Sequence, residues 1–193
     1  VIVARSPSGE IRTFPTVEMV VSDVSNMLDF LLSPARLSPS IERQCIEIAE
    51  SLATALDLIG LLAVELFVSQ DGQVLINEIA PRPHNSGHHS IEANITSQFE
   101  QHVRAVCDMP LGDTALKSPA VMVNLVGAEG YQGPVRYEGF NRILTMRNVY
   151  IHIYGKAETR PFRKMGHVTI VRPDVNEAID IAQQIKEEIQ VIA

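Results

Sequence analysis

The sequence predicts an α+β fold, with an antiparallel sheet and helices followed by a small β-rich carboxyl-terminal domain. The first part of the chain alternates short apolar runs that end at turn residues, typical of strands, with two segments of helical periodicity. After a break at residues 110–112 come three further strand-like runs and one amphipathic helix. We therefore expect two domains, residues 1–117 and residues 118–193.

Composition narrows the class of protein. With 46% hydrophobic and 20% charged residues, the 193-residue chain resembles an ordinary globular protein with a sizeable core. The net charge of -7 argues against non-specific nucleic-acid binding, and no apolar run approaches the roughly 18 residues of a membrane span. Cys45 and Cys107 lie in apolar helical patterns without a CxxC partner, so we expect buried free thiols in a cytoplasmic protein.

Two strands are expected at the start of the chain, Val1–Arg5 and Ile11–Phe14, on either side of a Ser-Pro-Ser-Gly turn. The first residue is not Met, and the run that it begins reads as the middle of a strand. We therefore expect the natural amino terminus to lie upstream. Residues 22–37 are mixed in character and predict an irregular connection.

The first helix is expected after Ser38, a suitable N-cap that is followed by Pro39 at the first helical position. Gly60 is its expected stop. The apolar residues at helical spacing are Ile41, Cys45, Ile48, Ala49, Leu52 and Leu56.

A second helix is expected to open at the capping box Ser97–Glu100 and to run to about Cys107. In the carboxyl-terminal domain, strands are expected at residues 120–126, 150–154 and 167–172. The final helix is marked by Ala178, Ile181, Ala182, Ile185 and Ile189.

A β-hairpin is the most informative element. Residues 61–69 and 73–79 read as strands, and Asp71-Gly72 between them is a strong hairpin signal. A two-residue turn at this dipeptide would place Glu65 directly opposite Glu78, with both side chains on the same face of the sheet.

Two facing carboxylates repel each other among apolar neighbours, which a purely structural hairpin would avoid. Either one of Glu65 and Glu78 holds a proton, or a cation lies between them. Oxygen ligands suit Mg²⁺, which commonly takes one or two carboxylates together with phosphate oxygens. The alternative from spacing alone is that both glutamates face solvent on an exposed hairpin.

The loop that follows is dense in functional groups. Arg82 offers a guanidinium suited to phosphate or carboxylate, and Gly87 permits close backbone approach. A zinc site made by His84 and His88 would need helical geometry, which the neighbouring proline and glycine discourage. The hydrogen-bonding residues of this loop are His84, Asn85, Ser86 and His88.

This segment, Asn-Glu-Ile-Ala-Pro-Arg-Pro-His-Asn-Ser-Gly-His at residues 77–88, resembles the ATP-grasp superfamily. Within it, the chain resembles the ATP-dependent N5-carboxyaminoimidazole ribonucleotide synthetase family. Further matching segments are Ala63–Phe67, Thr96–His102, Tyr154–Lys156 and Arg163–His167, so the resemblance covers nearly the whole chain. It implies that the first domain is the carboxyl-terminal part of an ATP-grasp domain.

The resemblance implies cofactors and roles. Glu65 and Glu78 would bind the Mg²⁺ that holds the phosphates of ATP, and Asn77 would lie with Glu78 at the ATP site. Arg82 would stabilise the transferring phosphoryl group. His84 and Asn85 would be catalytic, and Ser86 would contact the substrate where bicarbonate meets the acceptor amine.

A basic cluster in the second domain comprises Lys156, Arg160, Arg163 and Lys164. Seen alone, it reads as a solvated basic loop. The resemblance implies instead that Lys156, Arg163 and Lys164 bind the 5′-phosphate of 5-aminoimidazole ribonucleotide. The implied reaction is ATP-dependent carboxylation of this ribotide with bicarbonate, through carboxyphosphate, by a homodimer without nucleic-acid or membrane partners.

One departure concerns Ala80, where many ATP-grasp enzymes carry asparagine as a further ligand. Two alternatives remain open: a formate-dependent glycinamide ribonucleotide transformylase, which Asn85 disfavours, and a non-catalytic nucleotide-binding module. The chain is expected to form about half of such an enzyme and to be inactive alone.

Overall fold

A computed structural model describes residues 1–21 and 28–193 and divides into two compact units. The first unit comprises Val1–Glu18 and Ser33–Lys117, and the second comprises Met19–Leu32 and Ser118–Ala193. The later division falls between Lys117 and Ser118. Residues 19–32 belong to the second unit instead of the first, because strands on both sides of residues 22–27 join the second sheet.

The sheet of the first unit is antiparallel at each pairing and has the strand order β2-β1-β5-β6. Its inner strands are β1 and β5. Most of β1 and the first five residues of β5 are buried on both faces, which explains why these stretches read as continuous apolar runs. The strands are β1 (Ile2–Arg5), β2 (Ile11–Thr13), β5 (Gly60–Val68) and β6 (Val74–Ala80).

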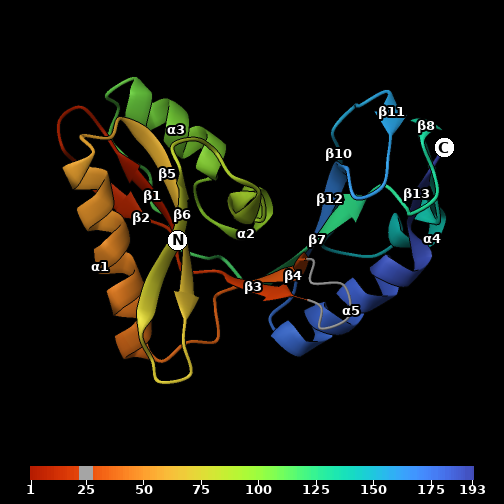
Figure 1. The fold of residues 1–193 in the computed structure, drawn as a ribbon, viewed down its shortest axis with the longest axis horizontal. Coiled ribbons are helices and arrows are strands. Elements are labelled where there is room, and N and C mark those ends of the chain that lie inside the picture. The colour runs from red at the N-terminus through yellow and green to blue at the C-terminus, as the bar shows by residue number, and fades with distance from the viewer. Residues whose placement is uncertain (22–27) are drawn as a thin grey trace. The chain divides into compact units, whose positions relative to one another are not determined.

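Helices cover both faces of this sheet (Figure 1). On one face, α1 (Pro39–Ala55) packs Cys45 against Leu62. On the other face, α3 (Gln98–Val106) packs Ala105 against Leu61. Successive residues of β5 therefore alternate between the α1 face and the α3 face, and this alternation fixes where the functional side chains point.

Both N-caps are confirmed: Ser38 accepts a hydrogen bond from the Ile41 amide at 3.4 Å, and Ser97 accepts one from the Glu100 amide at 3.2 Å. The expected stop at Gly60 is wrong, because α1 ends at Ala55 and Gly60 begins β5. A Cβ on this glycine would lie 2.9 Å from the His102 ring, so the residue serves strand–helix packing.

The two cysteines differ from each other. Cys45 is a buried free thiol, as expected. Cys107 is also free but exposed, so the expectation of burial is wrong for it. It is the C-cap of α3, one residue beyond the amphipathic part of the helix.

The second unit has a sheet of order β10-β12-β7-β4-β3, on which α5 (Val175–Glu188) packs through Ala178, Ala182 and Ile185. Its strands are β3 (Glu18–Val21), β4 (Leu28–Ser33), β7 (Ala120–Val126), β10 (Val149–Ile153) and β12 (Lys164–Val171). The three strands and the helix expected here are present, and the α+β class is confirmed. The irregular connection expected at residues 22–37 is wrong for Leu28–Ser33, which form β4. Residues 22–27 lie outside the described residues.

Several short elements of the second unit escaped sequence analysis. They are β8 (Gly133–Pro134), β9 (Arg136–Glu138), α4 (Phe140–Ile143), β11 (Glu158–Thr159) and β13 (Gln190–Ile192). Their pairings join distant segments, since β13 pairs with β9 and β11 with β8.

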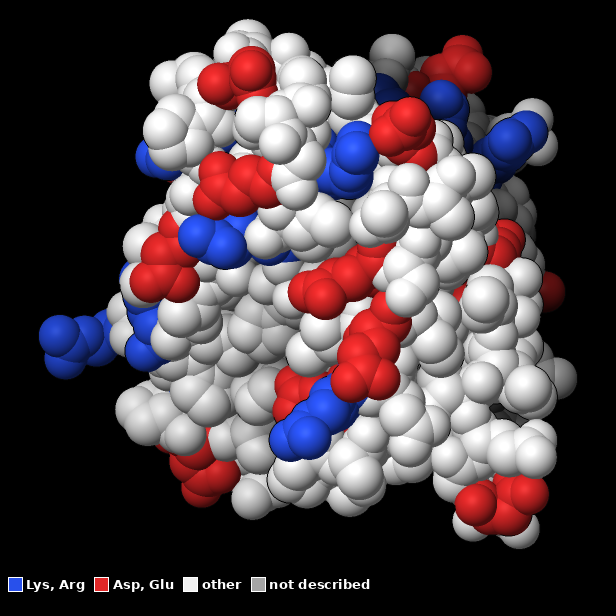
Figure 2. Space-filling view, turned by 90° about the vertical axis from the view of Figure 1, so that its left-hand side faces the viewer, with Lys and Arg blue, Asp and Glu red and all other residues white. Residues whose placement is uncertain are grey.

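The surface carries charges of both signs. Seen from the side on which α1 lies, acidic and basic side chains are interspersed with uncharged ones (Figure 2). No helix among the described residues is long and apolar enough to cross a membrane.

Candidate functional site

In the β5–β6 hairpin, Glu65 and Glu78 lie opposite each other, but the strand register that places them there differs from the expected one. The turn has a three-residue loop, with Ser69 N donating to Gln73 O at 2.9 Å and Gly72 at φ +83°. The strands therefore pair one residue out of the expected register near the turn. A β-bulge at Asn77 adds one residue to β6 and restores the pairing of Glu65 with Glu78.

The two carboxylates meet a histidine on the α3 face. Ligand atoms of Glu65, Glu78 and His84 all lie within 4.8 Å of one another. Asn77 Nδ2 donates to Glu65 Oε2 at 3.4 Å, and His84 Nε2 lies 3.7 Å from Glu65 Oε1. No arginine in the described ranges forms an ion pair with either carboxylate. The hairpin thus brings together a cluster that is open to solvent at the exposed Glu78.

Hydrogen bonding shows which of these groups can hold a cation. The Ser86 amide donates to His84 Nδ1, and the Ser86 hydroxyl lies 2.9 Å from the same nitrogen. Nδ1 is therefore an acceptor, and neutral His84 carries its proton on Nε2, toward Glu65. The atoms available to bind a cation are then carboxylate oxygens, which suit Mg²⁺ better than zinc.

Ala80 leaves this site without a third oxygen ligand. It is partly buried against the apolar cluster formed by β1, β5 and α3. Among the described residues, Glu65 and Glu78 are thus the side chains that could hold Mg²⁺ at this site.

The loop after β6 folds back onto α3 through η1 (Asn85–Gly87) and α2 (Ser90–Ala93). Asn85 is half-buried at the start of η1, and Ser86 is buried, with its hydroxyl against His84. Arg82 is exposed, and its guanidinium donates to the neighbouring Pro83 carbonyl at 3.1 Å. The loop therefore places His84 and its partner Ser86 beside the carboxylates and leaves the Arg82 guanidinium at the surface.

His89 supports this loop from inside the unit. Its Nδ1 lies 3.1 Å from Ser86 O, and its buried Nε2 has no hydrogen-bond partner among the described residues. Burial lowers the pKa of His89 from 6.5 to about 4. The neutral ring donates from Nδ1 to the Ser86 carbonyl. Sequence analysis missed His89, because a histidine adjacent to His88 carries no signal of burial.

We expect His89 to make stability pH-dependent. Because its folded pKa lies near 4 and the unfolded value is 6.5, the unfolded chain takes up a proton first as pH falls. Stability should be complete above pH 6.5 and should fall by about 3 kcal/mol toward pH 4. Urea unfolding across this range should show that His89→Asn, whose amide can replace Nδ1, lacks this loss. Parallel curves for the two proteins would contradict the assignment.

In the basic cluster of the second unit, two side chains donate hydrogen bonds to nearby backbone carbonyls. Lys156 Nζ donates to Lys164 O at 2.6 Å and lies 5.7 Å from the centre of the Tyr154 ring. Arg163 donates to Glu158 O at 2.8 Å. These contacts hold the side chains of Lys156 and Arg163 while leaving further N–H donors for an anion.

Gly127 clamps the loop that carries this cluster. Its amide donates to Arg163 O, and its carbonyl accepts from Phe162 N, both at 2.9 Å. A Cβ at Gly127 would lie 2.2 Å from Arg160 O. Phe162 is held at φ +63°, an unusual conformation for a bulky residue. The basic loop is therefore held in a defined, strained conformation.

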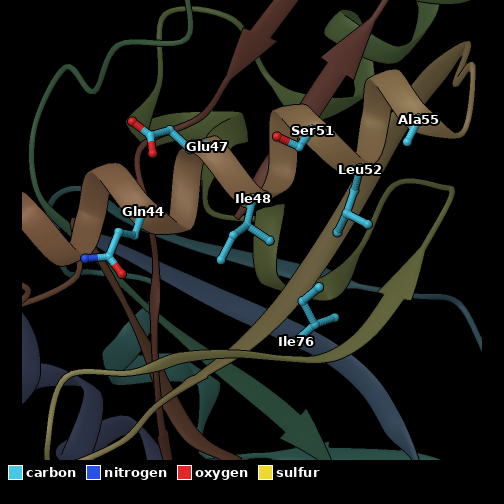
Figure 3. Close-up of a pocket in the computed structure, with 7 residues that line it drawn as sticks. All are labelled: Gln44, Glu47, Ile48, Ser51, Leu52, Ala55 and Ile76. Carbon is cyan, nitrogen blue, oxygen red and sulfur yellow. The ribbon is translucent and has the colours of Figure 1, made fainter.

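A shallow groove of about 500 Å³ lies elsewhere on the first unit, between α1 and β6 (Figure 3). Ile48 and Leu52 of α1 point toward Ile76 of β6 across it. Ile76 pairs with Leu66 on the α1 face, so the groove lies on the opposite side of the sheet from the carboxylates. We therefore do not assign it to the candidate site.

The fold and the two potential metal-binding glutamates on its antiparallel hairpin indicate the class of protein. Residues 1–99 match the family model described as the ATP-grasp domain. The chain belongs to the ATP-grasp family.

Residues 120–181 match the phosphoribosylaminoimidazole carboxylase C-terminal domain. The chain is 46% identical over 179 residues to the N5-carboxyaminoimidazole ribonucleotide synthase of Bacillus subtilis, covering 93% of this chain and 45% of that protein. It also matches the N5-carboxyaminoimidazole ribonucleotide synthetase of Thermotoga maritima, with a TM-score of 0.91 and 46% identity, over 100% of this chain and 51% of that one.

A third similar structure is the N5-carboxyaminoimidazole synthase of Aspergillus clavatus in complex with ADP and 5-aminoimidazole ribonucleotide. Its TM-score is 0.80 at 32% identity, covering 94% of this chain and 50% of that one. The chain thus spans about half the length of the relatives that it matches.

Proposed function

We propose that the protein carrying this chain catalyses ATP-dependent carboxylation of 5-aminoimidazole ribonucleotide with bicarbonate, a step of purine biosynthesis. The observation that carries the proposal is the bulged hairpin that opposes Glu65 and Glu78 beside His84, on a chain of this family. Similarity to the synthase of Bacillus subtilis and to the structure with ADP and the ribotide supports the choice of substrate.

The chemistry joins two transfers. The terminal phosphoryl group of ATP passes to a bicarbonate oxygen, which gives carboxyphosphate and ADP. The exocyclic amine of the ribotide then attacks the carboxyl carbon, loses a proton and releases phosphate. Bound Mg²⁺ would supply neutralising charge to the phosphates, and Glu65 and Glu78 would hold it.

Other side chains take roles that follow from their placement. Asn77 orients Glu65 through its amide, at 3.4 Å, and shares the ATP site with Glu78. Arg82, exposed after β6, stabilises the transferring phosphoryl group. His84 and Asn85 serve the carboxylation step, and Ser86 assists substrate binding by fixing the His84 ring.

The second unit supplies the ribotide phosphate site in this proposal. Lys156, Arg163 and Lys164 are the cations assigned to it, and the first two are already oriented by backbone carbonyls. We also propose a homodimer in the cytoplasm, where the free thiols Cys45 and Cys107 stay reduced.

An apolar pair extends the site on the α3 face. Phe67 and Leu75 are cross-strand partners, and Phe67 follows Glu65 by two residues on the same face. They are 61% and 52% exposed, so both can contact a bound molecule. Next to carboxylates that hold phosphates through a metal ion, this pair suits a purine base, and we assign it to the adenine of ATP.

We expect Phe67→Ala to raise KM for ATP about tenfold, because the base loses about 1.4 kcal/mol of apolar contact. KM for the ribotide should stay within twofold. Ile76→Ala is the matched control, since Ile76 is 53% exposed on the same hairpin but lies on the other face. Equal effects of the two variants on KM for ATP would argue against this placement of the base.

The test of function is phosphate release by the protein with Mg-ATP, with the ribotide and bicarbonate added or withheld. Release that requires both supports the proposed reaction. Release driven by formate and glycinamide ribonucleotide would identify a transformylase instead. Absence of turnover with either ribotide in a folded protein that binds ATP would favour a non-catalytic nucleotide-binding module.

A further inference from the structure

Gln98, the first residue of α3, is fully buried beneath the functional loop. Its Oε1 accepts from the His84 amide at 2.9 Å, and its Nε2 donates to the His84 carbonyl at 2.8 Å. One side chain thus binds both polar groups of the His84 backbone, much as a neighbouring strand would. This fixes the residue whose ring lies 3.7 Å from Glu65.

The same amide also fixes a second ring. Because Oε1 faces an N–H group and Nε2 faces a carbonyl, the orientation of the Gln98 amide is determined. Nε2 also lies 2.8 Å from His88 Nδ1, to which it can only donate. Nδ1 of His88 is therefore an acceptor, and the ring proton lies on Nε2. The ring stacks on Phe99, with centroids 5.5 Å apart.

Gln98 is itself held firmly. Its backbone amide donates to Ser90 Oγ at 2.8 Å, and the Ser90 hydroxyl donates onward to Gly87 O at 2.5 Å. A Cβ at Gly87 would lie 2.6 Å from Gln98 Oε1, so a larger residue at this position would displace the Gln98 amide. The clamp thus joins a helix terminus to the loop through side-chain and backbone bonds together.

We propose that Gln98 is a positioning residue of the candidate active site, which aims the rings of His84 and His88 from the rigid end of α3. The inference deepens the proposed function and rests on it where turnover is measured. Groups held on a helix are placed more reproducibly than groups on a free loop, and small displacements of catalytic groups reduce rates strongly. Gln98 touches no reacting atom and acts through the two histidines.

Gln101 provides a matched control. It is also fully buried on α3, and its amide also clamps one backbone unit. Its Nε2 donates to Gly112 O at 3.0 Å, and its Oε1 accepts from Gly112 N at 2.8 Å. Gly112 lies outside the loop of the candidate site, so Gln101→Met and Gln98→Met remove similar bonds with different consequences for the site.

We expect Gln98→Met to lower kcat about 10-fold to 100-fold while KM for Mg-ATP stays within twofold, because the hairpin glutamates are not held by the clamp. Gln98→Met and Gln101→Met should lower the melting temperature by similar amounts. Gln101→Met, however, should leave kcat within twofold of the parent value. Equal losses of kcat in both variants would overturn the proposal, as would an unchanged kcat in Gln98→Met.

The tautomer of His88 can be measured spectroscopically, which tests the positioning role of Gln98 independently of turnover. Imidazole nitrogen NMR should show a single neutral tautomer of His88, protonated at Nε2, in the parent protein and a tautomer mixture in Gln98→Met. In Gln98→Glu, which keeps the acceptor but replaces the donor by oxygen, His88 should become protonated at Nδ1. Spectra of His88 that match the parent in both variants would overturn the inference. This measurement needs no turnover, so it decides the matter even if the proposed reaction fails.

Discussion

Glu78→Gln should reduce turnover about 100-fold to 1000-fold in the protein that carries this chain. The substitution keeps the size and place of the side chain but turns one of two metal-facing carboxylates into a neutral amide, which removes a negative charge and leaves one oxygen in place of two. Loss of one preorganised charge contact in phosphoryl transfer typically costs this much. Binding of Mn²⁺, used in place of Mg²⁺ and followed by its paramagnetic signal, should weaken in parallel.

The stability of the Glu78→Gln variant toward urea should not fall together with its activity. Glu65 and Glu78 are cross-strand partners of like charge, and such pairs destabilise a hairpin. Without metal, the variant should therefore unfold at the same urea concentration as the parent or a slightly higher one. Loss of turnover with full stability distinguishes a metal ligand from a structural residue.

Glu47→Gln is the matched control for this experiment. Glu47 is exposed on α1 and lines the groove on the other face of the sheet, so its replacement makes the same charge change away from the carboxylate pair. It should leave turnover and Mn²⁺ binding within twofold of the parent values. If Glu78→Gln behaves in the same way as Glu47→Gln, the hairpin is not the metal site.

The opposition of the two glutamates was predicted correctly, but through two errors that cancel. The turn has one loop residue more than the Asp-Gly signal suggested, and β6 carries a bulge at Asn77. A bulge has no reliable sequence signature, because it depends on how the strands twist against their neighbours. The predicted pair was therefore right although the predicted turn was wrong.

Elements with strong local signals were predictable, whereas elements formed by distant pairing were not. The N-caps Ser38 and Ser97 act through bonds within one turn of helix, so sequence alone indicates them. By contrast, β13 pairs with β9 across about fifty intervening residues, and each contributes only three residues. Such short strands are stabilised by tertiary packing, which no local pattern encodes.

The supports of the candidate site were also beyond sequence reasoning. Gln98 reads as part of a capping box, yet its side chain clamps the His84 backbone fourteen residues earlier in the chain. His89 reads as one more polar loop residue, yet it is buried and neutral. Both act by hydrogen bonds to backbone groups, which every residue possesses, so nothing in the sequence marks their targets.

Lys156→Met should raise KM for the ribotide about 10-fold to 100-fold, the equivalent of one charge-assisted hydrogen bond to phosphate. Lys156 already donates to Lys164 O at 2.6 Å, so its ammonium group is held in place before a phosphate arrives. KM for ATP should stay within twofold, because the nucleotide is assigned to the hairpin of the first unit. Raising the ionic strength should weaken ribotide binding by the parent more than by the variant.

The lysine chosen as a control for this variant is Lys117, which is exposed and lies in the first unit. Lys117→Met removes the same charge, and any effect of net charge alone on the anionic ribotide should therefore appear in both variants. We expect KM for the ribotide to change only in Lys156→Met. A rise in KM for ATP as large as that for the ribotide would show that the basic cluster serves the nucleotide. An unchanged KM for the ribotide would mean that Lys156 only braces the strained loop around Phe162, because its bond to the Lys164 carbonyl would then be its whole role.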